Sequence, residues 1–469
     1  GRMQKQLSSG DEKVRRRATL LLAQIFDRRP NVSLKPAAVH LLVVFLCNRL
    51  KDELSLEPAL HALQALLTHH RDSMLAKYHD HMDVLHTIVT DVHIQGSAQS
   101  IRSRAFTLMA LVLDSLHAST VSGMQGADDW LRGVVAAGEG EKDPRCLLQF
   151  LKILKRCSVV FQQAFHDSHA LQQLLFDAVE CYFPITFAPP PDDVFGVTTD
   201  MLVDALQAVM CSPPLLRLST PFLIEQLEIA DLSIGKRHSL QALVQQAKDS
   251  GVRETMGSKG HLTRFVELAF ELCTDTTADQ ASVCESALWA VRELSAICER
   301  ELRAIRSTKK TSRGSAAKEK ANAPEELKEE ADTEEEKEKE LADWRALPEA
   351  LLAQTTTELQ RAGLAGLKSR HAARVAFAVA RAGYMCCAAA VGRVLPLLLP
   401  GLETACERLG TTIKSAAAAR VMGVTPDSVS TAVQQERNAA AAVIGILAQL
   451  LQCLPSDNDT SSAGLMTSH

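Results

Sequence analysis

Apolar residues recur along most of this chain at the spacing of one face of an α-helix. Near the start, Val14, Ala18, Leu21 and Ile25 repeat at steps of three and four residues. Polar or proline-containing stretches separate such segments, and no segment reads as a strand. The pattern therefore predicts helices over residues 14–26, 40–50, 54–67, 74–92, 101–116, 128–135, 143–154, 163–182, 199–210, 221–229, 233–247, 262–272, 281–305, 347–359, 372–384, 394–409 and 428–451.

The spacing of the helix pairs predicts the architecture. Pairs recur about every forty residues, which is the range of HEAT and armadillo repeats. Aromatic residues make up only 4% of the chain, while alanine and leucine are abundant, and this composition favours helices over strands. We predict an all-α protein, an α-solenoid in which each helix pair packs on the next; a compact helical bundle is the alternative. Ser9 and Glu12 are expected to form a capping box before the first long helix.

A charged segment interrupts the helical pattern after residue 305. Residues 308–315 are basic and polar, and residues 324–340 are strongly acidic, PEELKEEADTEEEKEKE. Such a segment has little apolar surface to bury, so we expect a solvated, disordered linker; a docking segment for a basic partner is the alternative. The predicted organisation is a HEAT-like solenoid over 1–305, a charged linker over 306–340, further Ala-rich helical repeats over 341–454 and a disordered tail over 455–469.

Composition restricts the possible functions. A net charge of −5 gives no support to a mainly electrostatic nucleic-acid binder. No window of about eighteen apolar residues is free of charge, so no transmembrane helix is predicted. Most of the twelve cysteines, including Cys157, Cys273, Cys284 and Cys453, lie in apolar helical runs. We expect reduced, buried thiols there.

No catalytic constellation is recognisable. The chain contains no GxxxxGK[ST], GxGxxG, GxSxG or CxxC motif. His79, His86 and His93 stand at steps of about two helical turns, too far apart to bind one metal ion together. Asp192 and Asp193 precede a predicted helix, where carboxylates stabilise the N-terminus. The sequence therefore predicts no enzyme activity, no cofactor and no metal site.

The stretch 180–193, ECYFPITFAPPPDD, is the most distinctive part of the sequence. Tyr182, Phe183 and Phe187 are followed or interrupted by prolines that forbid helix. We expect a helix to end here, an extended segment to cross the surface, and a new helix to begin after Gly196. The three aromatic side chains are expected to pack between adjacent repeats, with a partner surface as the alternative.

Four segments, in order, carry a resemblance to a known family. They are 40–52 (HLLVVFLCNRLKD), 140–147 (GEKDPRCL), 181–193 (CYFPITFAPPPDD), and 223–227 (LIEQL) followed by 239–241 (SLQ). The segments are similar to those of the methyl-methanesulfonate-sensitivity DNA repair/transcription protein family, the HEAT-repeat scaffold of the cytosolic iron–sulfur cluster assembly (CIA) targeting complex. The resemblance covers about residues 12–300.

The resemblance implies a non-catalytic adaptor in the cytoplasm and nucleus. Its partners would be CIA targeting subunits and apo iron–sulfur clients such as DNA helicases and polymerases, with no direct nucleic-acid or membrane binding. The alternative is a generic HEAT-repeat interaction scaffold, for example a transport or chromatin adaptor. Full-length family members are longer, so we expect a fragment that lacks the C-terminal HEAT region tied to the targeting partners.

The family segments supply the candidate site residues, each of which has a partner-surface and a structural interpretation. Asp143 is expected to cap a helix, and Arg49 to stack between repeats if it does not contact a partner. The candidates are Asn48, Arg49, Lys51, Asp52, Glu141, Lys142, Asp143, Arg145, Tyr182, Phe183, Phe187 and Asp192.

Overall fold

The structure is a computed structural model that describes most of the chain. The described residues are 2–28, 34–75, 80–116, 127–187, 196–257, 260–274, 280–319, 346–361, 367–421 and 426–452. Every regular element in these ranges is a helix, which confirms the all-α prediction. Contacts group the helices into two compact units, Gly1–Ser219 and Thr220–His469.

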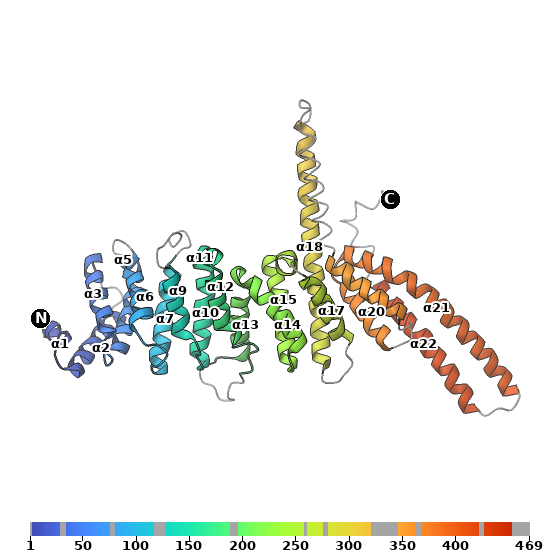
Figure 1. Cartoon of the computed structure of the whole chain (residues 1–469), viewed down its shortest axis with the longest axis horizontal. Helices are drawn as coiled ribbons and strands as arrows, with labels where there is room; N and C mark the ends of the chain where they lie inside the picture. The colour runs from blue at the N-terminus through green and yellow to red at the C-terminus, as the bar shows by residue number, and fades with distance from the viewer. Residues whose placement is uncertain are drawn as a thin grey trace. The chain divides into compact units, whose positions relative to one another are not determined.

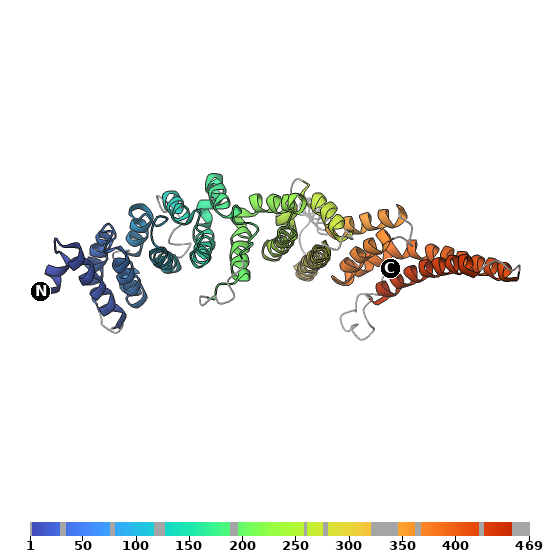
Figure 2. The ribbon, with the colours of Figure 1, turned by 90° about the horizontal axis from the view of Figure 1, so that it is seen from below.

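The first unit is a two-layer α-solenoid (Figures 1 and 2). In one layer, each helix packs on the next: α2 (Glu12–Arg28), α4 (Leu56–His69), α7 (Gln99–Ser115), α10 (Pro144–Val160) and α13 (Thr199–Met210). The other layer consists of α3 (Pro36–Arg49), α6 (Asp80–Asp91), α9 (Ala127–Gly138) and α12 (His169–Glu180). Shorter elements complete the unit: α1 (Arg2–Leu7), α5 (Arg71–Leu75), α11 (Gln162–Asp167) and the 3-10 helix η1 (Pro213–Leu215). The division between the units falls within α14 (Leu216–Ile229).

The core of the first unit lies where the layers meet. Phe106 of α7 and Phe150 of α10 are fully buried, and their ring centroids are 5.9 Å apart. Gly138, at the end of α9, lies against the same ring: a Cβ there would come within 2.2 Å of Phe150. Only glycine permits this close approach, so the end of α9 is fixed by the packing of α7 and α10.

Side-chain caps set several helix starts. Ser168 caps α12 by accepting from the Leu171 N–H at 3.4 Å, so the single helix predicted over 163–182 is divided into α11 and α12. The predicted capping box of Ser9 and Glu12 is wrong. Asp11 Oδ1 instead accepts from the Lys13 N–H at 2.8 Å, because aspartate is as good an N-cap as serine and stands next to the helix.

The second unit contains helices of widely different lengths, from five to 39 residues. They are α15 (Ser233–Ser250), α16 (Val252–Met256), α17 (His261–Thr274), α18 (Ala281–Glu319), a helix over 346–361, α20 (Leu367–Ala380), α21 (Tyr384–Val421) and α22 (Pro426–Gln452). α18 packs against α15, α17 and α20, and α20 also contacts α17, α21 and α22. The apolar faces of these helices thus form one continuous core.

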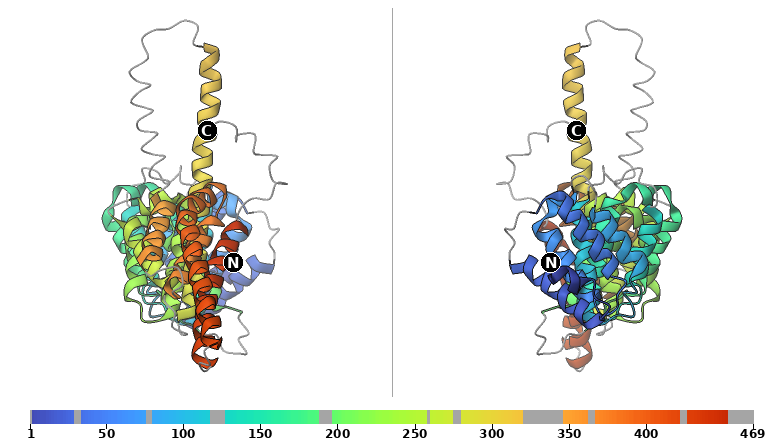
Figure 3. Two further views of the ribbon diagram at one scale, coloured as in Figure 1. Left: turned by 90° about the vertical axis from the view of Figure 1, so that its right-hand side faces the viewer. Right: turned by 90° about the vertical axis from the view of Figure 1, so that its left-hand side faces the viewer.

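The charged segment falls within the sequence range of the second unit. α18 continues to Glu319 and projects beyond its neighbours (Figures 1 and 3), so residues 306–319 are helical, because alanine, lysine and arginine extend a helix readily. α20 packs against both α17 and α18, so helices from the two sides of the insert belong to one unit. Residues 320–345 and the predicted tail lie outside the described residues.

One helix of the second unit is unusually apolar. Within α21, Met385–Ser415 is long and apolar enough to cross a membrane by length and composition alone, and a bent pair, Thr199–Met210 with Pro213–Ile229, passes the same test if counted as one span. Core helices also pass this test, so it is weak support for a span. α21 packs against α20 and α22. The expectation of no transmembrane helix stays a prediction.

Candidate functional site

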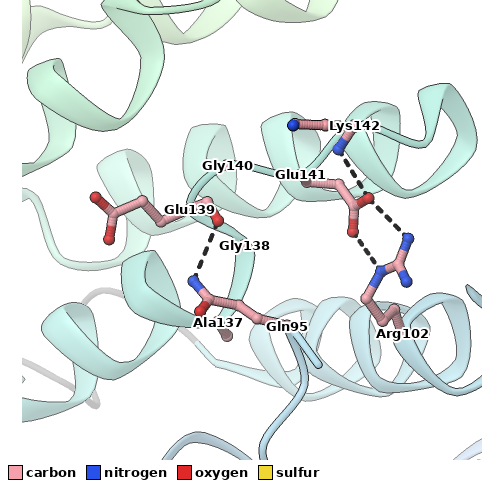
Figure 4. A pocket seen from close by; sticks show the side chains of 8 residues that line it. All are labelled: Gln95, Arg102, Ala137, Gly138, Glu139, Gly140, Glu141 and Lys142. Atoms are coloured by element: carbon pink, nitrogen blue, oxygen red, sulfur yellow. Dashed lines mark hydrogen bonds and ion pairs between the residues drawn. The ribbon is translucent and has the colours of Figure 1, made fainter. Parts of the chain in front are cut away.

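A nearly buried ion pair holds the turn that contains the family segment 140–147. Glu141 lies between α9 and α10 and is only 8% exposed. Arg102 of α7 donates from Nε to Glu141 Oε2 at 2.7 Å and from Nη2 to Oε1 at 2.9 Å (Figure 4). The backbone N–H groups of Lys142 and Asp143 donate to Oε1 at 3.0 and 2.9 Å. Both carboxylate oxygens are engaged, so Glu141 is a structural tie and is not available as a general base.

The same arginine also holds its own preceding turn. Arg102 Nη1 donates to the Ser97 carbonyl at 2.8 Å. The hydrogen bond to Glu141 raises the pKa of Arg102, although burial alone would lower it, so the guanidinium stays charged. One side chain therefore joins two turns that are far apart in the sequence, and it neutralises a carboxylate that would otherwise be costly to bury.

A second arginine repeats this construction in α2. Arg15 is the fourth residue of its helix, counted from Glu12, as Arg102 is counted from Gln99. Arg15 Nε donates to Asp52 Oδ2 at 3.0 Å, and Nη1 donates to the Ser9 and Gly10 carbonyls at 2.9 and 3.0 Å. Asp52 belongs to the turn before α4, as Glu141 belongs to the turn before α10. We name Arg15–Asp52 and Arg102–Glu141 the two edge clamps.

The first edge clamp sets the ionisation of its carboxylate. Burial alone would raise the pKa of Asp52, but hydrogen bonds from Arg15 and Ser55, with the charges of Arg15 and Arg49, lower it below the ordinary value of 3.8. Ser55 Oγ donates to Asp52 Oδ2 at 3.0 Å, and Arg49 Nη1 lies 3.7 Å from the same atom. Asp52 is therefore ionised throughout the neutral range.

This depressed pKa predicts a pH dependence of stability. Because the folded-state pKa lies below the unfolded value, ionised Asp52 stabilises the fold above pH 3.8, and the contribution is lost as the pH falls through the folded-state pKa. We expect Asp52→Asn to lower the melting temperature most near neutral pH and less below about pH 4. Circular dichroism melts across this range measure the difference. Glu53→Gln, exposed in the same turn, is the control. A difference that does not change with pH would contradict the prediction.

The family segment 181–193 contains Tyr182, Phe183 and Phe187, and we name it the aromatic landmark. It meets the turn of the second edge clamp. The Tyr182 hydroxyl is buried near Glu141, and burial, with the charges of Cys181 and Glu141, raises its pKa to about 12. α12 ends at Glu180, and the Tyr182 N–H donates to the Val179 carbonyl at 3.1 Å. Two of the family segments therefore lie against each other in the first unit.

The rest of the landmark leads to α13. The Thr199 hydroxyl donates to the Phe187 carbonyl, which ties the segment to the start of that helix. Phe183 and Phe187 are half-buried, and the Phe183–Pro184 peptide bond is cis. Asp192 and the three consecutive prolines lie outside the described residues.

A small polar cavity lies beside the second edge clamp (Figure 4). Its volume is about 210 Å³, and its walls are Gln95, Arg102, Ala137, Gly138, Glu139, Gly140, Glu141 and Lys142. Gln95 Nε2 donates to the carbonyls of Ala136 and Glu139 at 2.6 and 3.1 Å, so it holds the other end of the turn. Lys142 is exposed at the far side of the turn from Arg102. The cavity is framed by structural contacts, and its charged residues Glu139 and Lys142 are exposed to solvent.

The remaining candidate residues divide into paired and exposed side chains. Asp143 caps α10 as predicted, accepting from the N–H groups of Arg145 and Cys146 at 3.0 and 3.2 Å. Its pKa is lowered: burial opposes the shift, but the Arg145 side chain and the backbone donors outweigh it. Lys51 pairs with Asp91 at 3.3 Å.

Helix α3 carries two further candidates, Arg49 and Asn48. Arg49 lies over the ring of Phe45 in its own helix, with its guanidinium carbon 5.6 Å from the centroid. Its stacking between repeats stays a prediction. Asn48 is exposed. The described candidates therefore form two separate groups in the first unit, around Asp52 and around Glu141. Among these described candidates, Asn48 and Lys142 are exposed, and their side chains form no structural hydrogen bond or ion pair.

Sequence reasoning missed the arginines of the two edge clamps. The available signal was an arginine at the fourth position of two helices, each followed by an acid 37 or 39 residues later. Within the described part of the chain, no group of three or more histidine, cysteine, aspartate or glutamate side chains is placed to hold a metal ion. His79 is not among these residues.

The described cysteines are mostly buried. Cys157, Cys273 and Cys284 are buried as predicted, and burial raises the pKa of Cys157 to about 12. Cys181 and Cys406 are exposed, while Cys453 lies outside the described residues. Buried thiols with raised pKa values are protonated at neutral pH and behave as small apolar groups.

Comparison with known proteins gives the family. The chain is 32% identical to the MMS19 nucleotide excision repair protein homolog of Dictyostelium discoideum over 240 residues, which is 51% of this chain and 20% of that protein. The homolog of Homo sapiens is 32% identical over 240 residues, 50% of the chain and 22% of the relative. The homolog of Arabidopsis thaliana is 28% identical over 275 residues, which is 58% of this chain and 24% of that protein. The match thus spans less than a quarter of these relatives.

The match to the family covers the region where the two groups of candidate residues lie. Residues 1–267 match the family described as Dos2-interacting transcription regulator of RNA-Pol-II, and they include both edge clamps and the aromatic landmark. The chain therefore belongs to this family of MMS19-type DNA repair and transcription proteins.

Proposed function

We propose that this chain is part of a non-catalytic scaffold of the cytosolic iron–sulfur protein assembly targeting complex. In this role it connects the assembly machinery to apo iron–sulfur clients of DNA repair, replication and transcription, in the cytoplasm and the nucleus. The iron–sulfur cluster is cargo for the clients and is not bound by the scaffold. Family membership and the two-layer helical array of the first unit support the proposal, since stacked repeats offer long binding surfaces.

The observation that carries the proposal is the division of roles within the turn 139–143. Glu141 and Asp143 are held by buried or capping contacts, whereas Lys142 between them is exposed. A turn that is already held by these contacts presents its side chain without a further loss of backbone entropy when a partner binds. This arrangement suits recognition of another protein, because the carboxylates of Glu141 and Asp143 are already engaged while Lys142 and the neighbouring Glu139 are exposed.

An apolar stripe on α3 supplies the second contact. Leu41 is 69% exposed and Val44 is 43% exposed, and together with Asn48 they follow the spacing of one helix face. All three belong to the family segment 40–52, so we assign the partner contact to this stripe and to Lys142. Exposed apolar side chains gathered on one helix face form a surface that a partner protein can cover.

A pull-down tests the proposal. The tagged chain is used as bait in an extract of its own cells, and recovered proteins are identified by mass spectrometry while iron is assayed on the bait. We expect CIA targeting subunits or apo iron–sulfur DNA enzymes without stoichiometric iron on the bait. If neither class is recovered, with this chain or with a C-terminally extended version, the adaptor function is refuted.

Substitutions on the assigned surface make the test specific. Leu41→Asp combined with Lys142→Glu should reduce recovery of those partners at least about tenfold, which corresponds to about 1.4 kcal/mol. Val159→Asp is the matched control, because Val159 is 47% exposed on α10 and lies outside the assigned surface. Equal loss in the control and the double variant would show a general effect on folding and would remove the support for this surface.

A further inference from the structure

Two adjoining cavities in the second unit lie between α18, α20 and α22. Their volumes are about 590 and 500 Å³. Arg374, Phe377 and Gln449 line both cavities, so the two form one groove, which we name the α18–α20–α22 groove. Its combined size accommodates a short peptide segment.

The groove combines apolar and aromatic surface. Trp289 of α18 is 39% exposed, although tryptophan is usually largely buried, and it lines the groove with Leu288 and the half-buried Phe377. Lys248 Nζ lies 5.7 Å from the Trp289 ring centroid, which orients the indole. Tryptophan and arginine together are the residues most enriched at the energetic centres of protein interfaces.

The charges of the groove are unbalanced. Arg292, Arg374 and Arg381 line it, against a single carboxylate, Glu285. Glu285 forms an ion pair with Arg374. Among the described residues, no acidic side chain forms an ion pair with Arg292 or Arg381, and both are exposed. Two guanidinium groups beside an exposed indole are thus available to a ligand.

The amide side chains of the groove are suited to hydrogen bonding with the extended backbone of a bound peptide. Asn438, Gln449 and Gln452 line it from α22, and amide groups can both donate to and accept from a peptide main chain. Ala441, Ala442, Gly445 and Ile446 of α22 form the remaining wall, and the three small residues leave room for a large side chain. The same features disfavour nucleic acid as a ligand, because the groove has only a small excess of positive charge and its walls are largely apolar.

We propose that the α18–α20–α22 groove binds a short acidic peptide segment of a partner protein, with one large apolar side chain. The acidic residues pair with Arg292 and Arg381, and the apolar side chain packs on Trp289 and Phe377. The arginines of the groove outnumber its single carboxylate, so an acidic peptide is the occupant that complements its charge. The proposal concerns the second unit and is independent of the surface assigned to α3 and Lys142.

Fluorescence anisotropy with the full chain tests the groove. The probe is a fluorescein-labelled peptide with glutamates on both sides of a phenylalanine. We expect saturable binding that weakens with added salt. The double variant Arg292→Glu/Arg381→Glu and the variant Trp289→Ala should each weaken it at least about tenfold. Arg300→Glu, exposed on the same helix but outside the groove, is the matched control and should bind as the unchanged chain does.

Several results would overturn the proposal. Binding unaffected by either groove variant, or equally strong binding of a peptide with alanine in place of the glutamates, would exclude this recognition. Displacement of the peptide by a single-stranded oligonucleotide at lower concentration would assign the groove to nucleic acid instead. A large gain in affinity on deletion of residues 324–340 would show that the chain's own acidic segment occupies it. Circular dichroism melts exclude misfolded variants from the comparison.

Discussion

Replacing Arg102 by alanine should lower the free energy of unfolding of the first unit by about 3 kcal/mol. The substitution leaves the Glu141 carboxylate, whose side chain is 5% exposed, buried without its cationic partner, and this is far costlier than loss of a surface pair. It also removes the tie between the turns before α7 and α10. Hydrogen exchange of the α7 and α10 amides measures the loss directly, without assuming that both units unfold together.

A neighbouring arginine provides the control for this prediction. Arg104 lies on the same helix, is 36% exposed, and approaches Glu57 only to 3.9 Å. Arg104→Ala should therefore cost less than about 1 kcal/mol. If the two variants lose the same stability, the second edge clamp contributes no more than a surface ion pair, and the structural interpretation of Glu141 is wrong.

Replacing Phe150 by alanine should destabilise the first unit by about 3–5 kcal/mol. Phe150 is fully buried, contacts Phe106 in the neighbouring helix, and closes the space beside Gly138. Its removal leaves a cavity where α7, α9 and α10 meet, and the three helices are too constrained to fill it. Thermal and urea unfolding of the chain, with exchange at α9, measure both the loss and its location.

An exposed residue of the same helix is the reference for Phe150. Val159→Ala, at a side chain that is 47% exposed, should change stability by no more than about 0.5 kcal/mol. A similarly small effect of Phe150→Ala would mean that the interior between the layers is loosely packed. The prediction therefore tests the two-layer arrangement as well as one side chain.

Periodicity was sufficient to predict the class of fold but not every boundary. The apolar spacing in α2, α7 and α10 predicts helices because it depends only on neighbouring residues. The break at Ser168 and the start at Asp11 were missed, since several capping residues compete locally and the winner depends on packing. The joining of α18 and α20 across the charged insert depends on contacts that no local pattern contains.

The candidate site was predictable only in part. Resemblance to the family located the turn at Glu141 and the aromatic Tyr182, but their meeting depends on the order of repeats in space. The arginines of the two edge clamps were missed because each lies 37 or 39 residues from its acid, beyond the range of helical pair rules. The exposure of Lys142 beside buried Glu141 likewise needs the folded turn.

The exposed Cys181 makes this molecule suitable for labelling at a chosen place. Cys181 immediately precedes Tyr182, and its thiol interacts electrostatically with the Glu139 carboxylate. Burial, with the charges of Glu180 and Glu139, raises its pKa, so maleimide coupling will be faster in mildly alkaline buffer. Once Cys47, Cys406 and Cys453 are replaced by serine, a dye on Cys181 would report the binding of a partner at the turn of Lys142 in real time, without altering any residue of the assigned surface.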